Sequence, residues 1–273
     1  MNIEDFEDIL YQKEKNGICT ATFNKPERRN AVSYLTFLEL YTVLEDMEQD
    51  STAKVLIIMG NPKGNAFSSG GYFEPDFFKS VQKEVRQEID LMDIAQKKLC
   101  LKLWKFYKPV IVAINGLAIG GAITMPLSGA DLIYMAEDAW LGFYFGKRAI
   151  IPEFGANFVL PFLVGFQKAK EICFFGEEIS AKKAYEMGLV NKILPKEKLI
   201  PYARKQALKL IPPQGPSLSI KLMKKTMHAY FIPILEQTLD LENKGLRKAF
   251  RSKDFMESMN SLKEKREPHF IGR

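Results

Sequence analysis

The longest apolar stretch of the chain, PVIVAINGLAIGGAITMPLSGA at residues 109–130, limits the possible folds more than any other segment. A membrane-spanning helix needs about 20 consecutive apolar residues. Here glycines, including the pair Gly120–Gly121, and Pro126 interrupt the run, because glycine favours loops and proline disfavours a helix interior. The stretch therefore predicts a strand that enters a glycine loop and then a short buried helix, and we expect no membrane span.

Strand-like and helix-like patterns alternate along the first two hundred residues. GICTATFNKP (17–26) and AKVLIIMGN (53–61) read as strands, and SYLTFLELYTVLEDMEQD (33–50) has apolar residues at helical spacing with Ser33 as its N-cap. NFVLPFLVGFQKAKEICFFG (157–176) reads as helical. Buried strands that alternate with helices are typical of an α/β fold with mainly parallel pairing.

The pattern changes near Pro195–Pro201, beyond which only helices are predicted. We therefore expect a core of residues 1–200 and a helical region of residues 201–273. The second region holds 15 Lys and Arg against 7 Asp and Glu, so the net charge of +6 comes wholly from this end. Such a surplus suits an anionic partner, whether a phosphate-bearing ligand, nucleic acid or an acidic subunit, or it is simply a solvated helix face.

The three cysteines lie far apart and form neither a CxxC pair nor a Cys/His cluster. This spacing indicates no zinc site and no disulfide framework. The N-terminal segment MNIEDFEDILYQKEKNG is acidic and has no signal-peptide core. Together these features predict a cytoplasmic protein, since free thiols are typical of that compartment.

Two glycine pairs follow apolar strands, Gly70–Gly71 in AFSSGG and Gly120–Gly121 in GLAIGG. Neither fits GxGxxG, and neither ends in the GK[ST] of a P-loop, so dinucleotide binding and nucleotide hydrolysis are poorly supported. A strand that runs through a glycine loop into a helix leaves backbone N–H groups free at the helix N-terminus. Two such loops facing each other would form an oxyanion hole, although close packing of turns alone also calls for glycine.

Several motifs occur in an order and at a spacing that resemble the crotonase superfamily, the enoyl-CoA hydratase/isomerase group. They cover the chain from about Gly17 to its C-terminus. The motifs are TFNKPERRNAVS, GNAFSSGGYF, KPVIVAINGLAIGGAITMPLSGADLIYMAEDAWLGF, ISAKKAYEMGLVNKILP and KEKREPHFIGR.

The resemblance implies an α/β fold, the crotonase (ClpP-like) spiral of ββα units with a C-terminal helical subdomain that packs a trimer or a dimer of trimers and closes the CoA pocket. It also implies an acyl-CoA thioester as ligand, with no metal and no separate cofactor, because coenzyme A is part of the substrate. The two oxyanion donors of the family fall on the backbone N–H groups of Gly71 and Gly121.

The same resemblance assigns substrate contacts near the first glycine loop. Ser69 would contact the adenine or pantetheine through its backbone, and Arg28 would lie near the CoA phosphates. Tyr72 and Phe73 begin an aromatic segment that lines an acyl tunnel or belongs to the core. Glu74 and Asp76 follow in that segment as alternative carboxylates.

The resemblance implies that the hydratases of the superfamily use two carboxylates, and this chain has neither of them. In the first position, the GGAITMP stretch holds Thr124 or Met125, and the second falls near Phe145. His228 and His269 match no catalytic position and are expected to be structural. Water therefore has no pair of acidic groups to activate it.

One carboxylate, Glu153, stands in the otherwise apolar AIIPEFGANF segment at 149–158. It matches the Pro-Glu of the Δ3,Δ2-enoyl-CoA isomerases in this superfamily, which the resemblance implies use that glutamate as acid and base. An apolar pocket should raise its pKa and favour return of a proton to carbon. We therefore predict an enzyme that shifts a double bond of an enoyl-CoA through an enolate.

Two other functions remain open from the sequence. The scaffold could support another enolate reaction: hydration with Glu153 as sole base, or hydrolysis or ring cleavage of a cyclic acyl-CoA. It could also be a non-catalytic crotonase-fold scaffold or RNA binder, which the basic C-terminal region allows. We expect no nucleic-acid partner, because the chain lacks the interleaved aromatic and basic residues of a known RNA module.

Overall fold

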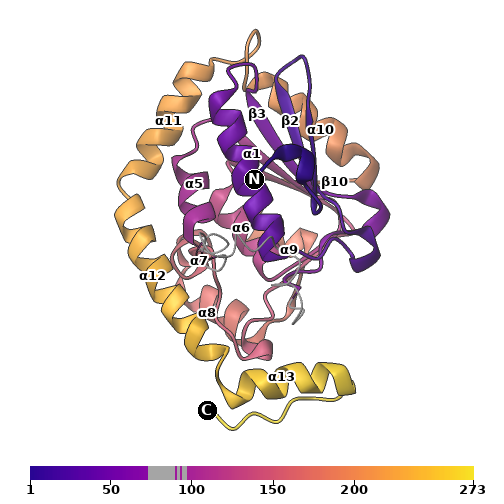
Figure 1. The fold of residues 1–273 in the computed structure, drawn as a ribbon, viewed down its shortest axis with the longest axis vertical. Coiled ribbons are helices and arrows are strands. Elements are labelled where there is room, and N and C mark those ends of the chain that lie inside the picture. Colours follow the sequence, from indigo (N-terminus) through magenta and orange to yellow (C-terminus); the bar gives the residue numbers. More distant parts are fainter. Residues whose placement is uncertain (73–89, 91–92, 94–96) are drawn as a thin grey trace.

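The computed structural model describes residues 1–72, 90, 93 and 97–273 (Figure 1). Within these residues the strands form one sheet of six in the order β1-β2-β3-β5-β7-β10 and one of four in the order β4-β6-β8-β9. The strands of the first sheet are β1 (Ile9–Lys13), β2 (Ile18–Phe23), β3 (Val55–Gly60), β5 (Val110–Ile114), β7 (Leu132–Ala136) and β10 (Lys192–Leu194), and those of the second are β4 (Ala66–Ser68), β6 (Leu117–Ile119), β8 (Trp140–Gly142) and β9 (Glu178–Ser180).

The chain passes repeatedly from the first sheet to the second. β3 leads to β4, β5 to β6 and β7 to β8, and neighbours β2-β3-β5-β7-β10 and β4-β6-β8 all pair in parallel. Of the described strands, only β1 and β9, at two sheet edges, pair antiparallel with their neighbours. This repeated step, with helices between successive pairs, confirms the predicted α/β fold and its spiral of ββα units.

Ten α-helices accompany the sheets in the described part of the chain, and the N-cap predicted for the first of them is confirmed. The Ser33 side chain accepts hydrogen bonds from Leu35 and Thr36, and the Thr36 side chain accepts one from the Ser33 N–H. The α-helices are α1 (Tyr34–Gln49), α5 (Leu99–Lys105), α6 (Gly121–Gly129), α7 (Ala156–Val164), α8 (Phe166–Phe175), α9 (Ala181–Glu186), α10 (Lys196–Lys209), α11 (Ser217–Ala229), α12 (Ile232–Ala249) and α13 (Lys253–Glu264).

Two details of the sequence prediction were wrong. The strand expected to run directly into the glycine loop is divided into β5 and β6, which belong to different sheets. Between them Asn115 accepts from Gly60 N (3.0 Å) and donates to Gly60 O (2.9 Å), so its side chain replaces a backbone partner at the end of β3. The helical stretch 157–176 is broken at Gly165, whose φ of 81° separates α7 from α8.

The C-terminal region contains only helices, as predicted. α10 packs against β5 and β7 of the first sheet, whereas α12 contacts α5 and α7. In Figure 1, α11 and α12 run one after the other along one side of the molecule, and α13 lies at the end near the C-terminus. The predicted division at residue 200 falls within α10 and stays a prediction. None of the described helices is long and apolar enough to cross a membrane.

Candidate active site

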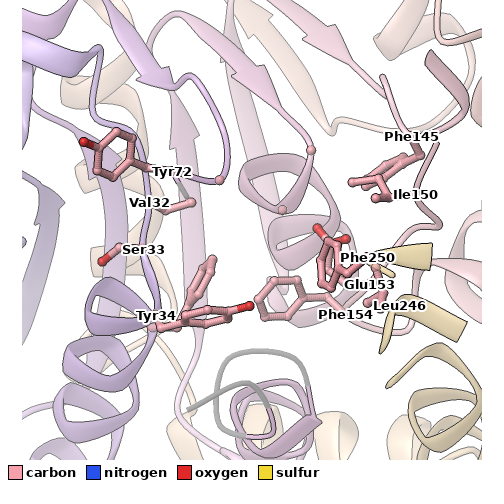
Figure 2. A pocket seen from close by; sticks show the side chains of 14 residues that line it. Val32, Ser33, Tyr34, Tyr72, Phe145, Ile150, Glu153, Phe154, Leu246 and Phe250 are labelled. Carbon is pink, nitrogen blue, oxygen red and sulfur yellow. The ribbon is translucent and has the colours of Figure 1, made fainter. Parts of the chain in front are cut away.

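A pocket opens where the start of α1, the first glycine loop, the start of α6, the 145–154 segment and the end of α12 meet. In Figure 2 its two flanks are formed by Val32, Ser33 and Tyr72 and by Phe145 and Ile150. Glu153 is the one charged side chain among the described residues that line it. These residues are Val32, Ser33, Tyr34, Phe37, Gly71, Tyr72, Gly120, Gly121, Phe145, Ile150, Glu153, Phe154, Leu246 and Phe250.

In the first glycine loop, the Gly71 N–H makes no hydrogen bond to the neighbouring segment around Val32. Val32 N donates to Gly70 O (2.9 Å), and Tyr72 N donates to Val32 O (2.8 Å). In a parallel bridge of this form, the N–H of the residue between the two bonded positions points away from the partner segment. Gly70 has a φ of 93°, and a Cβ there would lie 2.8 Å from Ile119 O, so this turn requires glycine.

Gly121 is the first residue of α6 and also lines the pocket. The first N–H groups of an α-helix have no acceptor within the helix, and they carry the positive end of its dipole. A Cβ on Gly121 would lie 2.9 Å from Oε1 of Glu153. The absence of a side chain at Gly121 therefore lets the Glu153 carboxylate approach the N-terminus of α6.

Glu153 lies in a constrained turn that leads into α7. The next two residues, Phe154 (φ 59°) and Gly155 (φ 73°), both have left-handed backbone conformations. Such a conformation is unfavourable for a bulky residue and persists only where the surroundings hold it. Phe154 is buried against Phe37, with ring centroids 5.0 Å apart, and its carbonyl accepts a hydrogen bond from the Cys100 thiol at 3.2 Å.

The environment raises the pKa of Glu153 to about 8. Burial is the main cause, and the negative charge of Glu242 adds to it. Thr124 opposes the shift, since its hydroxyl donates to Glu153 Oε1 at 3.4 Å. A glutamate with a pKa near neutrality can both accept and return a proton, which is what an acid/base catalyst requires.

The residues predicted to bind CoA lie at the side of the pocket formed by the first glycine loop. The guanidinium of Arg28 lies over the ring of Tyr72, 4.2 Å from its centroid, and Ser69 Oγ donates to Arg28 O at 2.9 Å. Tyr72 lines the pocket, so this cluster adjoins it directly. Phe73, Glu74 and Asp76 lie outside the described residues.

The two positions where a hydratase would carry carboxylates are occupied by other side chains in the structure too. Thr124 is buried and directed at Glu153, Met125 is buried in the core, and Phe145 is buried and lines the pocket. His228 lies away from the pocket, stacked on Trp104 with Nδ1 2.9 Å from the Trp104 carbonyl. His269 is near the C-terminus, where its N–H donates to Glu257.

The sequence reasoning expected the C-terminal helices to close the CoA pocket but named none of the residues that α12 and its C-cap contribute. Leu246 and Phe250 close one side of the pocket, and Glu242 binds the turn that follows Glu153. A signal was present in the sequence, because Glu242 takes an inward position in the buried series Leu235, Leu239, Glu242, Leu246. A carboxylate on the apolar face of an amphipathic helix indicates a specific buried partner.

The described part of the chain contains no group of three or more His, Cys, Asp or Glu side chains that could hold a metal ion. The fold and the pocket together define a crotonase-fold protein whose pocket is lined by two glycine turns and one acidic side chain. Residues 13–273 match the family described as enoyl-CoA hydratase/isomerase, so the chain belongs to this family of the crotonase superfamily, whose members act on CoA thioesters.

The relatives include both isomerases and hydratases. The chain is 30% identical to the 1,2-epoxyphenylacetyl-CoA isomerase of Escherichia coli, over 98% of this chain and 99% of that protein. It is 27% identical to the crotonyl-CoA hydratase of Syntrophomonas wolfei, over 98% and 99%. A solved enoyl-CoA hydratase/isomerase from Pseudoalteromonas atlantica, 23% identical, superposes with a TM-score of 0.85 over 97% of this chain and 100% of that one, which shows the shared fold.

Proposed function

We propose that the chain is an acyl-CoA double-bond isomerase that converts a 3-enoyl-CoA into a 2-enoyl-CoA, with Glu153 as its acid and base. The observation that carries this proposal is the position of Glu153, a single carboxylate with a raised pKa in an apolar pocket that Gly71 and Gly121 also line. Relatives named as an isomerase and a hydratase of CoA thioesters support the substrate class.

The backbone N–H groups of Gly71 and Gly121 would bind the thioester oxygen. They would stabilise the negative charge that develops on this oxygen when a proton leaves C2, with a contribution of about 3–4 kcal/mol each. Glycine suits both positions, since Gly71 follows a turn that excludes a side chain at Gly70, and Gly121 leaves room for the Glu153 carboxylate.

The proton transfer needs one carboxylate and no water. The ionised Glu153 takes a proton from C2, and the electron pair of that C–H bond forms the C1–C2 double bond of a dienolate with its charge on the thioester oxygen. The protonated Glu153 then returns the proton to C4. The thioester carbonyl re-forms and the carbon–carbon double bond moves from C3 to C2, so atoms and charges balance.

The remaining site residues take supporting roles in this proposal. Arg28 and Ser69 would bind the CoA phosphates and the adenine or pantetheine, beside the ring of Tyr72, and Phe73 would extend the acyl pocket. A homo-oligomer, a trimer or a dimer of trimers, is supported by the exposed rings of Phe162 on α7 and Phe166 on α8, which a monomer would leave in water.

The test offers purified protein a 3-enoyl-CoA and a 2-enoyl-CoA in separate reactions. We expect isomerisation of the first, and a loss of about 10²–10⁴-fold in kcat for Glu153→Gln, because general acid–base catalysis contributes this much. The matched control is Glu197→Gln, an exposed glutamate on α10. Hydration of the 2-enoyl-CoA that survives Glu153→Gln would overturn the proposal in favour of a hydratase.

A further inference from the structure

Glu242 is a second buried carboxylate close to the pocket, and the proposed mechanism does not use it. It lies on the inward face of α12, is 3% exposed, and has Leu239 and Leu246 as neighbours on that face. A carboxylate in such a place costs free energy unless donors surround it. Among the described residues, no cation forms an ion pair with it; backbone and amide N–H groups bind it instead.

The donors all come from the start of α7. Gly155 N donates to Glu242 Oε2 at 2.7 Å, and Asn157 donates to Oε1 through its backbone N (3.0 Å) and through Nδ2 (2.8 Å). Asn157 Nδ2 also donates to the Pro152 carbonyl at 3.1 Å. Glu242 and Asn157 therefore bind both ends of the turn 152–157, and Glu153 lies within that turn.

This turn depends on external support. Phe154 and Gly155 are both left-handed, and a Cβ on Gly155 would collide with the Leu235 side chain of α12. Without its partner on α12, the turn would have other conformations available to it, because a bulky left-handed residue is strained. The contact with Glu242 thus fixes the direction in which the adjacent Glu153 side chain leaves the backbone.

Glu242 also acts on Glu153 through its charge. Burial raises the pKa of Glu242 to about 7, although its donors on α7 oppose that shift. Near pH 8 it is therefore largely ionised, and its negative charge raises the pKa of Glu153 in addition to the effect of burial. The other titratable groups here are Cys100 on α5, Tyr34 on α1 and Arg247 on α12. Burial raises the pKa of Cys100 to about 12 and that of Tyr34 to about 12, so both are neutral near pH 8.

We infer that Glu242 is a positioning residue for the reaction: it holds the turn that carries Glu153 and places a negative charge behind it. The inference rests on the proposed role of Glu153 as acid and base. It adds that the C-terminal helix α12, through Glu242, prepares a proton-transferring group 89 residues earlier in the chain.

The test compares Glu242→Gln with Asn157→Ala. The first keeps the volume of the side chain but removes the charge. Its amide has one oxygen that can accept and an N–H₂ group that cannot, so the donors of Gly155 and Asn157 are no longer both satisfied. We expect kcat to fall about tenfold, because the turn is no longer held in place, while KM changes about twofold at most. The pH of half-maximal kcat/KM should fall by about half a unit to one unit, since the charge that raises the pKa of Glu153 is gone. Asn157→Ala keeps the charge, so kcat should fall with a smaller shift of the pH profile.

A purely structural role predicts different results. In that case Glu242→Gln lowers Tm, but kcat and the pH profile, measured well below the Tm of both proteins, match those of the wild type and overturn the inference. Glu236→Gln, an exposed change on the same helix, is the matched control. If Glu242→Gln does not fold, Glu242→Asp, which keeps the charge but shortens the reach, must lower kcat without moving the profile toward lower pH.

A second readout separates this inference from the proposed function. Carbon-13 NMR of labelled glutamate side chains, assigned with Glu153→Gln, follows the titration of Glu153 without any substrate. A lower pKa of Glu153 in Glu242→Gln supports the inference even if Glu153→Gln retains activity and the isomerase proposal fails. An unchanged pKa, together with unchanged kcat, overturns the inference even if the isomerase proposal holds.

Discussion

Glu39 and Glu153 are two glutamates whose side chains lie inside the same protein, and their surroundings differ in one respect. Glu39, on α1, is fully buried and accepts hydrogen bonds from the backbone N–H groups of Glu7 (2.7 Å), Asp8 (3.0 Å) and Ile9 (2.8 Å). Glu153 lines the pocket and accepts a long side-chain hydrogen bond from Thr124 at 3.4 Å, together with an interaction from its own backbone N–H. Among the described residues no other side chain donates to it.

The pKa values alone would not separate these two groups. Burial raises the pKa of Glu39 to about 7 and that of Glu153 to about 8. The difference lies in the donors. Three backbone N–H groups bind the carboxylate of Glu39 and hold the N-terminal segment in place, whereas few donors bind Glu153, and in the proposed mechanism its carboxylate accepts a proton from the substrate. A raised pKa therefore indicates a reactive carboxylate only where hydrogen-bond donors are few.

Replacing each of the two glutamates tests this difference, and the largest expected effect is on the free energy of unfolding. Glu39→Ala leaves three N–H groups without their acceptor, and those of Asp8 and Ile9 are buried, which should lower the free energy of unfolding by about 3 kcal/mol. Glu153→Gln should leave that free energy unchanged or higher at neutral pH, because the buried carboxyl must take up a proton when the chain folds and the amide does not. Urea denaturation of both variants measures the two values.

Activity gives the control for this pair. Glu39→Ala should keep the wild-type kcat at a temperature where it is folded, since its contacts lie with the N-terminal segment. Equal stability of Glu39→Ala and wild type would show that water replaces the lost carboxylate. The distinction between Glu39 as a structural glutamate and Glu153 as a reactive one would then be wrong.

A smaller effect comes from moving the Glu153 carboxylate rather than removing it. Gly121 does not have a left-handed φ, so its backbone accepts alanine, but the new Cβ would lie 2.9 Å from Glu153 Oε1. We expect Gly121→Ala to lower kcat by about 100-fold, as a displacement of about 1 Å can. Its Tm should stay close to that of the wild type, because alanine favours a helix.

This variant is informative because the backbone N–H of residue 121 remains. Steady-state kinetics and thermal unfolding on the same preparation separate a displaced carboxylate from a damaged fold. Wild-type kcat in Gly121→Ala would mean that the carboxylate has room to move without consequence, which contradicts the close approach argued for the site.

Some features of the candidate site could be predicted from the sequence, and others could not. The motifs around Gly71, Gly121 and Glu153 predicted three positions that the structure brings to one pocket. These positions could be predicted because each glycine pair and the Pro-Glu turn is recognised from the residues next to it in the sequence. Their chemical roles stay predictions until they are tested by kinetics.

The individual residues that α12 contributes were beyond such reasoning, although the resemblance implied that the C-terminal helices close the CoA pocket. Glu242 reaches Gly155 and Asn157 across 87 and 85 residues of chain, and that contact depends on how a whole helix packs. Phe250 lines the pocket for the same reason. The break between α7 and α8 was missed because an apolar run on both sides of Gly165 fits helical spacing equally well, while the φ of 81° at this glycine ends the first helix.

The smallest expected effect concerns the long hydrogen bond from the Thr124 hydroxyl to the Glu153 carboxylate. Its ionised form takes the proton from substrate, so kcat/KM should rise about tenfold per pH unit below a pKa of about 8 and level off above it. The Thr124 hydroxyl stabilises the ionised form and lowers this pKa, so Thr124→Val should raise it. At pH 7 the variant should be about twofold slower, since a hydrogen bond this long is weak. The two proteins should reach the same rate above pH 9, and a profile displaced toward lower pH would show that Thr124 does not act on the carboxylate as its geometry indicates.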